Sequence, residues 1–198
     1  MNYYIGDLHL YCKNQLGVSG KKYDGRPFEN IEEMHKVMVE KWNARVTEDD
    51  TVYILGDVGM KLRKHSLYDV ISLMNGHKIL IQGNHDDLTD AGYLELFDEI
   101  HDYLEIQDVA NDRKYALILC HYPILMWNNQ HKGSILIYGH THNTIENEFF
   151  KDCIRRMNED INFRHEKEEA FKAINVGCMF PYMEYEPKSL KELLDLLY

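Results

Sequence analysis

A short apolar run, Ile79-Leu80-Ile81, leads through Gln82 into the polar turn Gly83-Asn84-His85-Asp86. Such an apolar run is typical of a strand that is buried inside a sheet. A strand that passes through a glycine into these polar residues places them at the carboxyl edge of the sheet, where open α/β sheets hold their sites. Because Asn, His and Asp are also ordinary turn residues, the stretch gains its weight from the recurrence of this pattern elsewhere in the chain.

Four other predicted strands end in the same way. They are expected at residues 3–5, 51–55, 115–119 and 134–138. The metal-binding or proton-carrying residues that follow them are Asp7 and His9, Asp57, His121, and His140 with His142. In an extended segment, residues two apart share a face, so the two members of such a pair can point together at one ion.

The segments between these strands predict the order of the elements. Asn30 followed by Glu33 resembles a capping box, and apolar residues at helical spacing predict a helix over about 30–44. A second helix is expected over 62–75. Strand, helix, strand, helix and strand in this order predict parallel pairing through right-handed crossovers. The later elements are expected to be a short helix at 91–97, a hairpin of 103–106 with 115–119, a helix with apolar spacing over 150–161, a strand at 173–177 and a closing helix at 190–197.

Length and composition exclude several classes of protein. The 198 residues suit one domain, and 44% hydrophobic with 28% charged residues is typical of a soluble globular protein. A net charge of −11 argues against nucleic-acid binding that depends on a basic surface. No apolar run is long enough to span a membrane, and Met1–Ile5 resembles a strand rather than a signal peptide. The four cysteines form no C-x-x-C motif, so free thiols and a cytoplasmic location are expected.

The residues at the strand ends are of the types that bind divalent metals. Carboxylate, imidazole and amide oxygen suit first-row ions such as Mn, Fe, Ni or Zn, and the absence of cysteine argues against a structural zinc site. Seven candidate ligands are too many for one catalytic ion and suit two ions that share a carboxylate. Two ions roughly 3.5–4 Å apart can clamp both oxygens of an in-line phosphoryl displacement and lower the pKa of a bridging water.

In their order along the chain, these motifs resemble the five blocks of the calcineurin-like metallophosphoesterases. The blocks are Asp7-x-His9, Gly56-Asp57, Gly83-Asn84-His85-Asp86, His121 and Gly139-His140-x-His142. Further short motifs are similar to those of a small bacterial and phage subgroup of predicted phosphoesterases. These motifs are Arg26-Pro27-Phe28, His121-Tyr122-Pro123, Trp127 and Asn175-Val176-Gly177. The resemblance implies an α/β fold with a two-sheet β sandwich core flanked by helices.

The resemblance also implies a role for each motif. One divalent ion would be held by Asp7, His9, Asp57 and His142, and the other by Asp57, Asn84, His121 and His140. Asp57 would bridge the two ions, for which Mn is the expected metal and Fe, Ni or Zn are alternatives. His85 would contact the phosphate and donate a proton, and Asp86 would orient its imidazole.

Two residues of the first long loop bear on substrate binding. Arg26 lies just before a proline, and its guanidinium either grips a phosphate oxygen, beside Asn84 and His85, or is a solvated surface group. Cys12 stands where a histidine is frequent in the subgroup, so a contact from this loop is in question.

The charge-rich segment 146–169 is interpreted as a helical insertion in a single domain that spans residues 1–198. Arg155 and Arg156 lie in this segment. They either form a basic wall beside the metals or belong to a solvated helix face.

Three functions remain open from the sequence. The preferred one is a phosphoesterase or nucleotide pyrophosphatase that acts on a small phosphate-containing substrate. A nuclease of the same fold is the second, although the acidic balance weakens it. The third is a binding protein that has lost the chemistry, but such a protein should lack ligands and none is missing here. The physiological substrate, the native metals and the oligomeric state do not follow from the sequence, since this fold hosts many phosphate esters.

Overall fold

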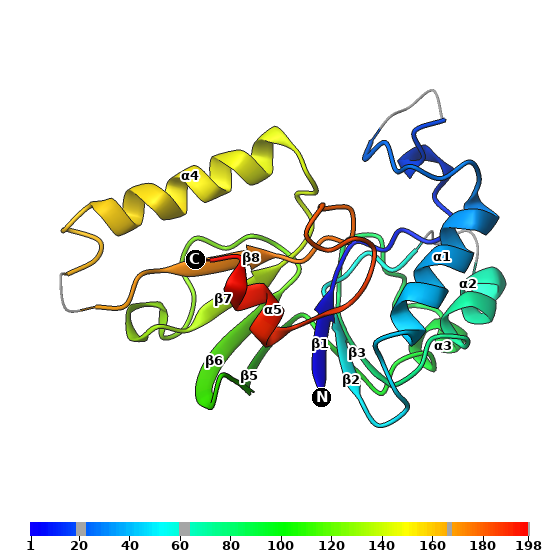
Figure 1. Ribbon diagram of the computed structural model, residues 1–198, viewed down its shortest axis with the longest axis horizontal. Helices are drawn as coiled ribbons and strands as arrows, with labels where there is room; N and C mark the ends of the chain where they lie inside the picture. Colours follow the sequence, from blue (N-terminus) through cyan, green and yellow to red (C-terminus); the bar gives the residue numbers. More distant parts are fainter. Residues whose placement is uncertain (19–22, 60–63, 166–167, 198) are drawn as a thin grey trace.

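Two sheets flanked by helices make up this mixed α/β structure, a computed structural model (Figure 1). It describes residues 1–18, 23–59, 64–165 and 168–197. The strands are β1 (Asn2–Ile5), β2 (Thr51–Ile54), β3 (His77–Ile81), β4 (Glu99–His101), β5 (Tyr103–Ala110), β6 (Arg113–Cys120), β7 (Ile135–Tyr138), β8 (Lys172–Asn175) and β9 (Lys188–Ser189). The α-helices are α1 (Ile31–Asn43), α2 (Lys64–Ile71), α3 (Ala91–Leu94), α4 (Ile145–Glu159) and α5 (Leu190–Asp195).

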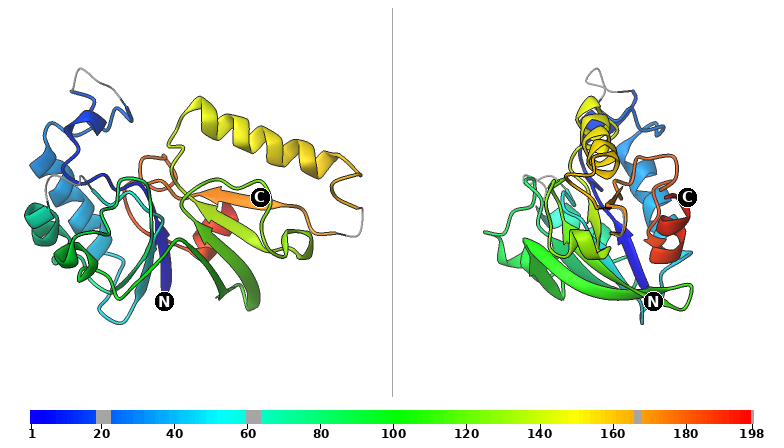
Figure 2. Two further views of the ribbon diagram at one scale, coloured as in Figure 1. Left: turned by 180° about the vertical axis from the view of Figure 1, so that it is seen from behind. Right: turned by 90° about the vertical axis from the view of Figure 1, so that its left-hand side faces the viewer.

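The first sheet has the order β4-β3-β2-β1-β9, and it confirms the parallel pairing that the sequence predicts. β1 pairs with β2, β2 with β3, and β3 with β4, all in parallel, while β9 runs antiparallel beside β1. The crossover helices α1 and α2 lie with α3 on the outer side of this sheet (Figure 1, Figure 2). The carboxyl ends of β1, β2 and β3 therefore meet at one edge.

The second sheet has the order β5-β6-β7-β8 and is covered on both faces. Alternate residues of β6 and β7 pack into the core shared with the first sheet: Leu117, Leu119, Ile135 and Ile137. The residues between them pack on the other face with apolar side chains of α4: Ile118, Cys120, Leu136 and Tyr138. A strand buried on both faces reads as a continuous apolar run, which is why the sequence shows these two strands clearly.

Two local features confirm their sequence signals. The side chain of Asn30 accepts a hydrogen bond from the backbone N of Glu33 at 2.8 Å, as an N-cap of α1 should. The carboxylate of Glu33 in turn accepts a hydrogen bond from the backbone N–H of Glu29, one residue before the cap. Asn111 and Asp112 both have positive φ, 50° and 59°, which is the conformation of a tight two-residue hairpin turn between β5 and β6.

Several predicted helix boundaries were wrong. α4 ends at Glu159, and Ile161, which was expected to extend its apolar stripe, is 61% exposed. α3 ends at Leu94 and α5 at Asp195, two or three residues before the predicted ends. The predicted start of α2 at Leu62 lies outside the described residues.

The cysteines are free, as expected: Cys12, Cys120 and Cys178 are buried and Cys153 is partly buried. Over the described parts of the chain, no helix combines the length and the apolar character that crossing a bilayer requires.

Candidate metal centre

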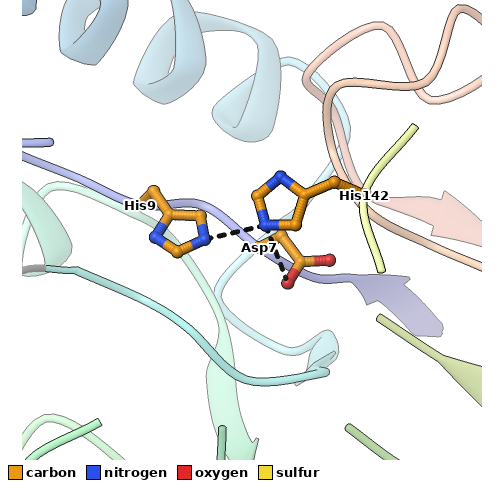
Figure 3. A group of neighbouring side chains, drawn as sticks. All are labelled: Asp7, His9 and His142. Carbon is orange, nitrogen blue, oxygen red and sulfur yellow. Dashed lines mark hydrogen bonds and ion pairs between the residues drawn. The ribbon is translucent and has the colours of Figure 1, made fainter. Parts of the chain in front are cut away.

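Polar side chains from five strand ends meet at the carboxyl edges of the two sheets. The ends of β1, β2, β3, β6 and β7 supply them. They form two groups, and within each group the candidate ligand atoms lie within 4.8 Å of one another. The first ligand group is Asp7, His9 and His142 (Figure 3), and the second ligand group is Asp57, His121 and His140. Each group has the residue types and the spacing to hold a metal ion.

Asp57, a member of the second group, also lies close to the first. Its Oδ2 is 3.6 Å from Nε2 of His9 and 3.7 Å from Nε2 of His121. Its Oδ1 accepts a hydrogen bond from the backbone N of His85 at 2.8 Å. Asn84, the remaining predicted ligand, has its Oδ1 3.3 Å from Nε2 of His121. The seven predicted ligands thus lie in one cluster, in which one oxygen of Asp57 is close to a histidine of each group.

Two glycines of the sequence motifs make room for these side chains. A Cβ at Gly83 would lie 2.3 Å from Oδ1 of Asp57, and a Cβ at Gly56 would lie 2.3 Å from Nδ1 of His121. Gly56 also has a φ of 81°, which glycine adopts at little cost. The glycines are therefore required by close approach to the candidate ligands.

Backbone strain is concentrated at the same residues. Of the eleven non-glycine residues with positive φ in the described part of the chain, five are candidate ligands: Asp7 (54°), His9 (47°), Asp57 (55°), His140 (69°) and His142 (47°). Such conformations cost about 1–3 kcal/mol each and persist where the surrounding structure enforces them, often at functional sites. The loops are therefore shaped to direct these side chains, at a cost in stability.

The hydrogen bonds of two histidines determine which ring nitrogen faces the cluster as an acceptor. Nδ1 of His121 lies 2.7 Å from the carbonyl O of Leu55, and Nδ1 of His142 lies 2.6 Å from Oδ1 of Asp24. Both contacts require the proton on Nδ1, so in the neutral form of each ring Nε2 carries the lone pair. Nε2 of His142 then faces Nε2 of His9 at 3.0 Å. Converging lone pairs and carboxylates of this kind fit a bound cation.

Burial controls the protonation of the first ligand group. It raises the pKa of Asp7 to about 6. Burial, together with the positive charge of Arg26, lowers the pKa of His9 well below its usual value. Burial also opposes the protonation of His142, but the hydrogen bond to Asp24 and the charge of Asp7 outweigh it and raise its pKa. A positive ion would reverse the effect of burial on Asp7, since bound cations invert the local pKa logic.

The candidate metal centre opens on a cleft of about 380 Å³. His85 lines this cleft, and its exposed side chain meets the ring of His9 edge-on at a centroid distance of 5.3 Å. Cys12, Asn14 and Gln15 of the first loop also line the cleft. The loop around Cys12 therefore does contribute to the wall of the site.

Asp86 does not orient the imidazole of His85, contrary to the prediction. Its buried carboxylate accepts hydrogen bonds from the backbone N of Gly83 (2.7 Å), Asp57 (2.9 Å) and Val58 (2.9 Å) and from the hydroxyl of Tyr93 (2.6 Å). Four donors occupy both oxygens. Asp86 instead holds together the two loops that carry Asp57 and Asn84.

The prediction that Arg26 contacts substrate is also wrong, and so is its alternative as a solvated surface group. The Arg26 side chain is fully buried. Its contacts are Oδ2 of Asp24, the carbonyl O atoms of Asp7 (2.8 Å) and Leu8 (2.6 Å), and Sδ of Met34 (3.8 Å). These contacts account for the five N–H groups of the guanidinium, so none is left for a phosphate.

A basic wall beside the metals is contradicted as well. Only the start of the segment 146–169 reaches the described lining of the cleft, through Glu146, while α4 runs away from the strand ends (Figure 1). Arg155 pairs with Asp152 and Glu159, and Arg156 pairs with Asp152. The alternative, a solvated helix face, describes both arginines.

Sequence reasoning missed Asp24. This residue, whose side chain is buried, follows no strand and belongs to none of the five blocks, yet it contacts both Arg26 and His142. Its position depends on how the loop folds back, where the backbone N of Arg26 donates to the carbonyl O of Gln15. A single sequence carries no signal for such a return.

Comparisons with known proteins give relatives without a described activity. No family model matches the chain. The gene 66 protein of Mycobacterium phage L5 is 28% identical over 166 residues, covering 71% of this chain and 76% of that protein. The crystal structure of the protein of unknown function AQ665 from Aquifex aeolicus is similar with a TM-score of 0.65 and 23% identity, covering 100% of this chain and 99% of that one. The likeness to this structure shows a shared fold.

A further relative shows the family. The uncharacterized protein MJ1445 of Methanocaldococcus jannaschii is 33% identical over 141 residues. The match covers 71% of this chain and 68% of that protein. On this likeness, the chain belongs to the same family as MJ1445.

Proposed function

We propose that the protein is a metal-dependent phosphoester hydrolase of the calcineurin-like type. In this proposal, two divalent ions are held by the first and second ligand groups and share Asp57. The substrate is a small, nucleotide-like phosphate ester or phosphoanhydride. The observation that carries the proposal is the position of Oδ2 of Asp57, 3.6 Å from Nε2 of His9 and 3.7 Å from Nε2 of His121.

The fold supports this proposal. In the calcineurin-like family, the resemblance implies two sheets whose strand ends carry the five blocks. Here two sheets flanked by helices bring the same five blocks together at the strand ends, in the same order along the chain. The chain also retains every ligand that the resemblance implies, which disfavours a binding protein that has lost the chemistry.

The donor set favours a first-row divalent metal. Carboxylate oxygen, imidazole nitrogen and the amide oxygen of Asn84 suit Mn, which we propose, as well as Fe, Ni or Zn. When bound, two such ions supply Lewis-acid activation of the phosphate and a water of lowered pKa. Asp57 would be a ligand to both ions. The Nδ1 contacts of His121 and His142 keep their Nε2 atoms directed into the ligand cluster.

His85 is the proposed proton donor to the leaving group. Its side chain is exposed at the cleft, and its backbone is tied to Asp57. A protonated imidazole in this position would transfer its proton to the leaving oxygen as the ester bond breaks. Asn84, whose Oδ1 lies 3.3 Å from Nε2 of His121, serves as a ligand and a substrate contact in the same proposal.

The size and the charge of the protein favour a small substrate. A cleft of about 380 Å³ matches the volume of small-molecule sites. The net charge of −11 supplies few of the counterion-releasing contacts on which nucleic-acid binding depends. We therefore propose small phosphate compounds as substrates in preference to nucleic acid.

The test is an activity panel on protein loaded with Mn²⁺. The substrates are nitrophenyl phosphate, bis-nitrophenyl phosphate, mononucleotides, cyclic nucleotides, dinucleotides and single-stranded DNA. We expect hydrolysis of one of the small substrates that chelation abolishes and Mn²⁺ restores, and that Asp57→Asn lacks. Activity restricted to DNA would establish the nuclease alternative. No metal-dependent hydrolysis of any substrate would contradict the proposed function.

A further inference from the structure

A buried salt bridge connects the loop at residues 23–27 to the first ligand group. The side chains of Arg26 and Asp24 are 0% and 2% exposed. Nε of Arg26 donates to Oδ2 of Asp24 at 2.9 Å, and a terminal nitrogen lies 2.8 Å from the same oxygen. The other carboxylate oxygen, Oδ1, accepts Nδ1–H of His142 at 2.6 Å. The guanidinium, the carboxylate and the imidazole therefore form one continuous chain.

The same guanidinium also holds the backbone of the other two residues of the group. It donates to the carbonyl O of Asp7 and to that of Leu8, which precedes His9. Asp7 and His9 have positive φ, so this segment does not continue the regular strand. A buried carbonyl without a hydrogen-bond partner destabilises the folded state. Arg26 supplies a donor to each of the two carbonyls, and the thiol of Cys178 is a second donor to that of Asp7.

The chemistry of this support differs between the two groups. Nδ1–H of His142 in the first group donates to the charged carboxylate of Asp24, whereas Nδ1–H of His121 in the second donates to the neutral carbonyl of Leu55. A buried ion pair is weak evidence for a gain in stability, because desolvation opposes the attraction. Its effect here is to fix one side chain and two stretches of backbone at the candidate ligands.

We propose that Arg26 and Asp24 are positioning residues that set the metal affinity of the first ligand group separately from that of the second. The inference rests on the proposed two-metal centre. A carboxylate that accepts the free N–H of a metal-binding histidine fixes its tautomer and raises its basicity, and loss of such a partner lowers metal affinity about 10–100-fold. Asp24 acts in this way on His142, and Arg26 holds both Asp24 and the loop of Asp7 and His9.

Titration of the metal-free protein with Co²⁺, followed by its visible absorption, tests this proposal. The wild-type protein should bind two equivalents. His142→Ala serves as the reference, because it identifies the equivalent that belongs to the first ligand group. Asp24→Asn preserves the size of the side chain and an oxygen acceptor but removes the charge. It should weaken the same equivalent about 10–100-fold and leave the other unchanged.

Arg26→Lys should weaken that equivalent as well, since the three N–H groups of an ammonium leave one atom and cannot reproduce the planar fork with which the guanidinium reaches two carbonyls and a carboxylate from three separate nitrogens. Arg45→Lys is the matched control, because Arg45 pairs with Glu186 and Glu192 and belongs to neither ligand group. Should Arg26→Lys fail to fold by circular dichroism, Asp24→Asn decides alone.

Wild-type affinity for both equivalents in Asp24→Asn would overturn the positioning role. So would an equal loss at both equivalents, which would indicate a general structural effect. A wild-type protein that binds no Co²⁺ would contradict the metal centre itself, and this result separates a failure of the proposed function from a failure of the present inference.

Discussion

The backbone N–H of His85 donates a hydrogen bond to Oδ1 of Asp57 across 2.8 Å. This bond ties the residue with the exposed imidazole to the carboxylate of the second ligand group that also lies close to the first. In the proposed centre, Asp57 would bind the metals, whereas His85 is not a ligand and lines the cleft.

From this division we predict that His85→Ala keeps both metals and loses activity in a way that depends on the leaving group. General acid catalysis contributes about 10²–10⁴-fold in rate. The loss should approach this range for an alkyl or nucleoside phosphate, whose alkoxide leaving group needs a proton. It should be small for a nitrophenyl ester, whose leaving group departs without one. The measurement is kcat on both substrates, with metal content determined in parallel.

His131→Ala is the control for removing an imidazole, because His131 is exposed and pairs with Glu168. Equal losses of His85→Ala on both substrates would favour a purely electrostatic contact to the phosphate. Loss of metal would mean that His85 is itself a ligand.

The second prediction concerns Asp86 as the clamp between two loops. Asp86→Asn places an amide NH₂ among four hydrogen-bond donors, so at least one backbone N–H loses its acceptor. We expect a loss of about 3 kcal/mol in the free energy of unfolding, measured by urea denaturation. Tyr93→Phe removes one of the four bonds and should cost about 1 kcal/mol.

Asp98→Asn is the matched control for Asp86→Asn. The Asp98 carboxylate is half-exposed and accepts the backbone N–H of Lys78. This substitution should change stability by less than about 0.5 kcal/mol. If Asp86→Asn were no more costly than the control, Asp86 would not have the role assigned to it.

The third prediction is a pH dependence of stability that His35 carries. This buried side chain on α1 accepts a hydrogen bond from the backbone N of Tyr11 at 3.0 Å, and burial lowers its pKa to about 4. The unfolded chain, with a pKa of about 6.5 for histidine, therefore binds a proton that the folded state resists. His35 therefore does not reduce the free energy of unfolding above about pH 6.5, and it reduces this free energy increasingly as the pH drops toward 4.

Between pH 7 and pH 5 the contribution of His35 is about 1–2 kcal/mol after allowance for solvent screening. His35→Gln keeps an acceptor and does not titrate, so this variant should lose less stability over the interval than the wild type. Urea denaturation at both pH values measures the difference. An identical drop in the two proteins would contradict the assignment.

The fourth prediction follows from the ion pairs of α4. Arg155 and Arg156 pair with acidic residues of their own helix and lie outside the described lining of the cleft. Replacing both with alanine should leave kcat and KM unchanged and have little effect on the free energy of unfolding, because ion pairs at an exposed surface contribute little to stability. A rise in KM without a change in kcat would contradict this prediction and would favour the hypothesis that Arg155 and Arg156 bind substrate.

Patterns that depend on neighbouring residues were sufficient to predict much of the fold. The apolar run Ile79–Ile81 and its four counterparts gave five strands, because burial on both faces imposes a continuous apolar pattern. The order of elements gave the parallel pairing of β1, β2 and β3. Helix ends were less accurate, as at Ile161, because an apolar residue in a polar context carries no information on where its helix stops.

The candidate ligands were predictable for the same reason, since each directly follows a strand. The partners of these ligands were not. Asp86 is next to His85 in sequence, but its carboxylate turns toward the backbone of another loop. Arg26 lies in a polar loop that suggested exposure, yet its partners are the carbonyls of Asp7 and Leu8. Contacts of this kind depend on long-range packing, which local sequence patterns do not encode.

The electron paramagnetic resonance spectrum of protein reconstituted with Mn²⁺ tests the central claim most directly. Two Mn²⁺ ions that share Asp57 should give a spin-coupled signal from the wild-type protein. Asp57→Asn should lose this signal and retain at most an isolated Mn²⁺ ion, whereas the control Asp108→Asn, whose carboxylate accepts the hydroxyl of Tyr4, should keep it. A coupled signal with two bound ions in Asp57→Asn would contradict the bridging role, and an uncoupled spectrum from the wild-type protein would contradict the two-metal centre.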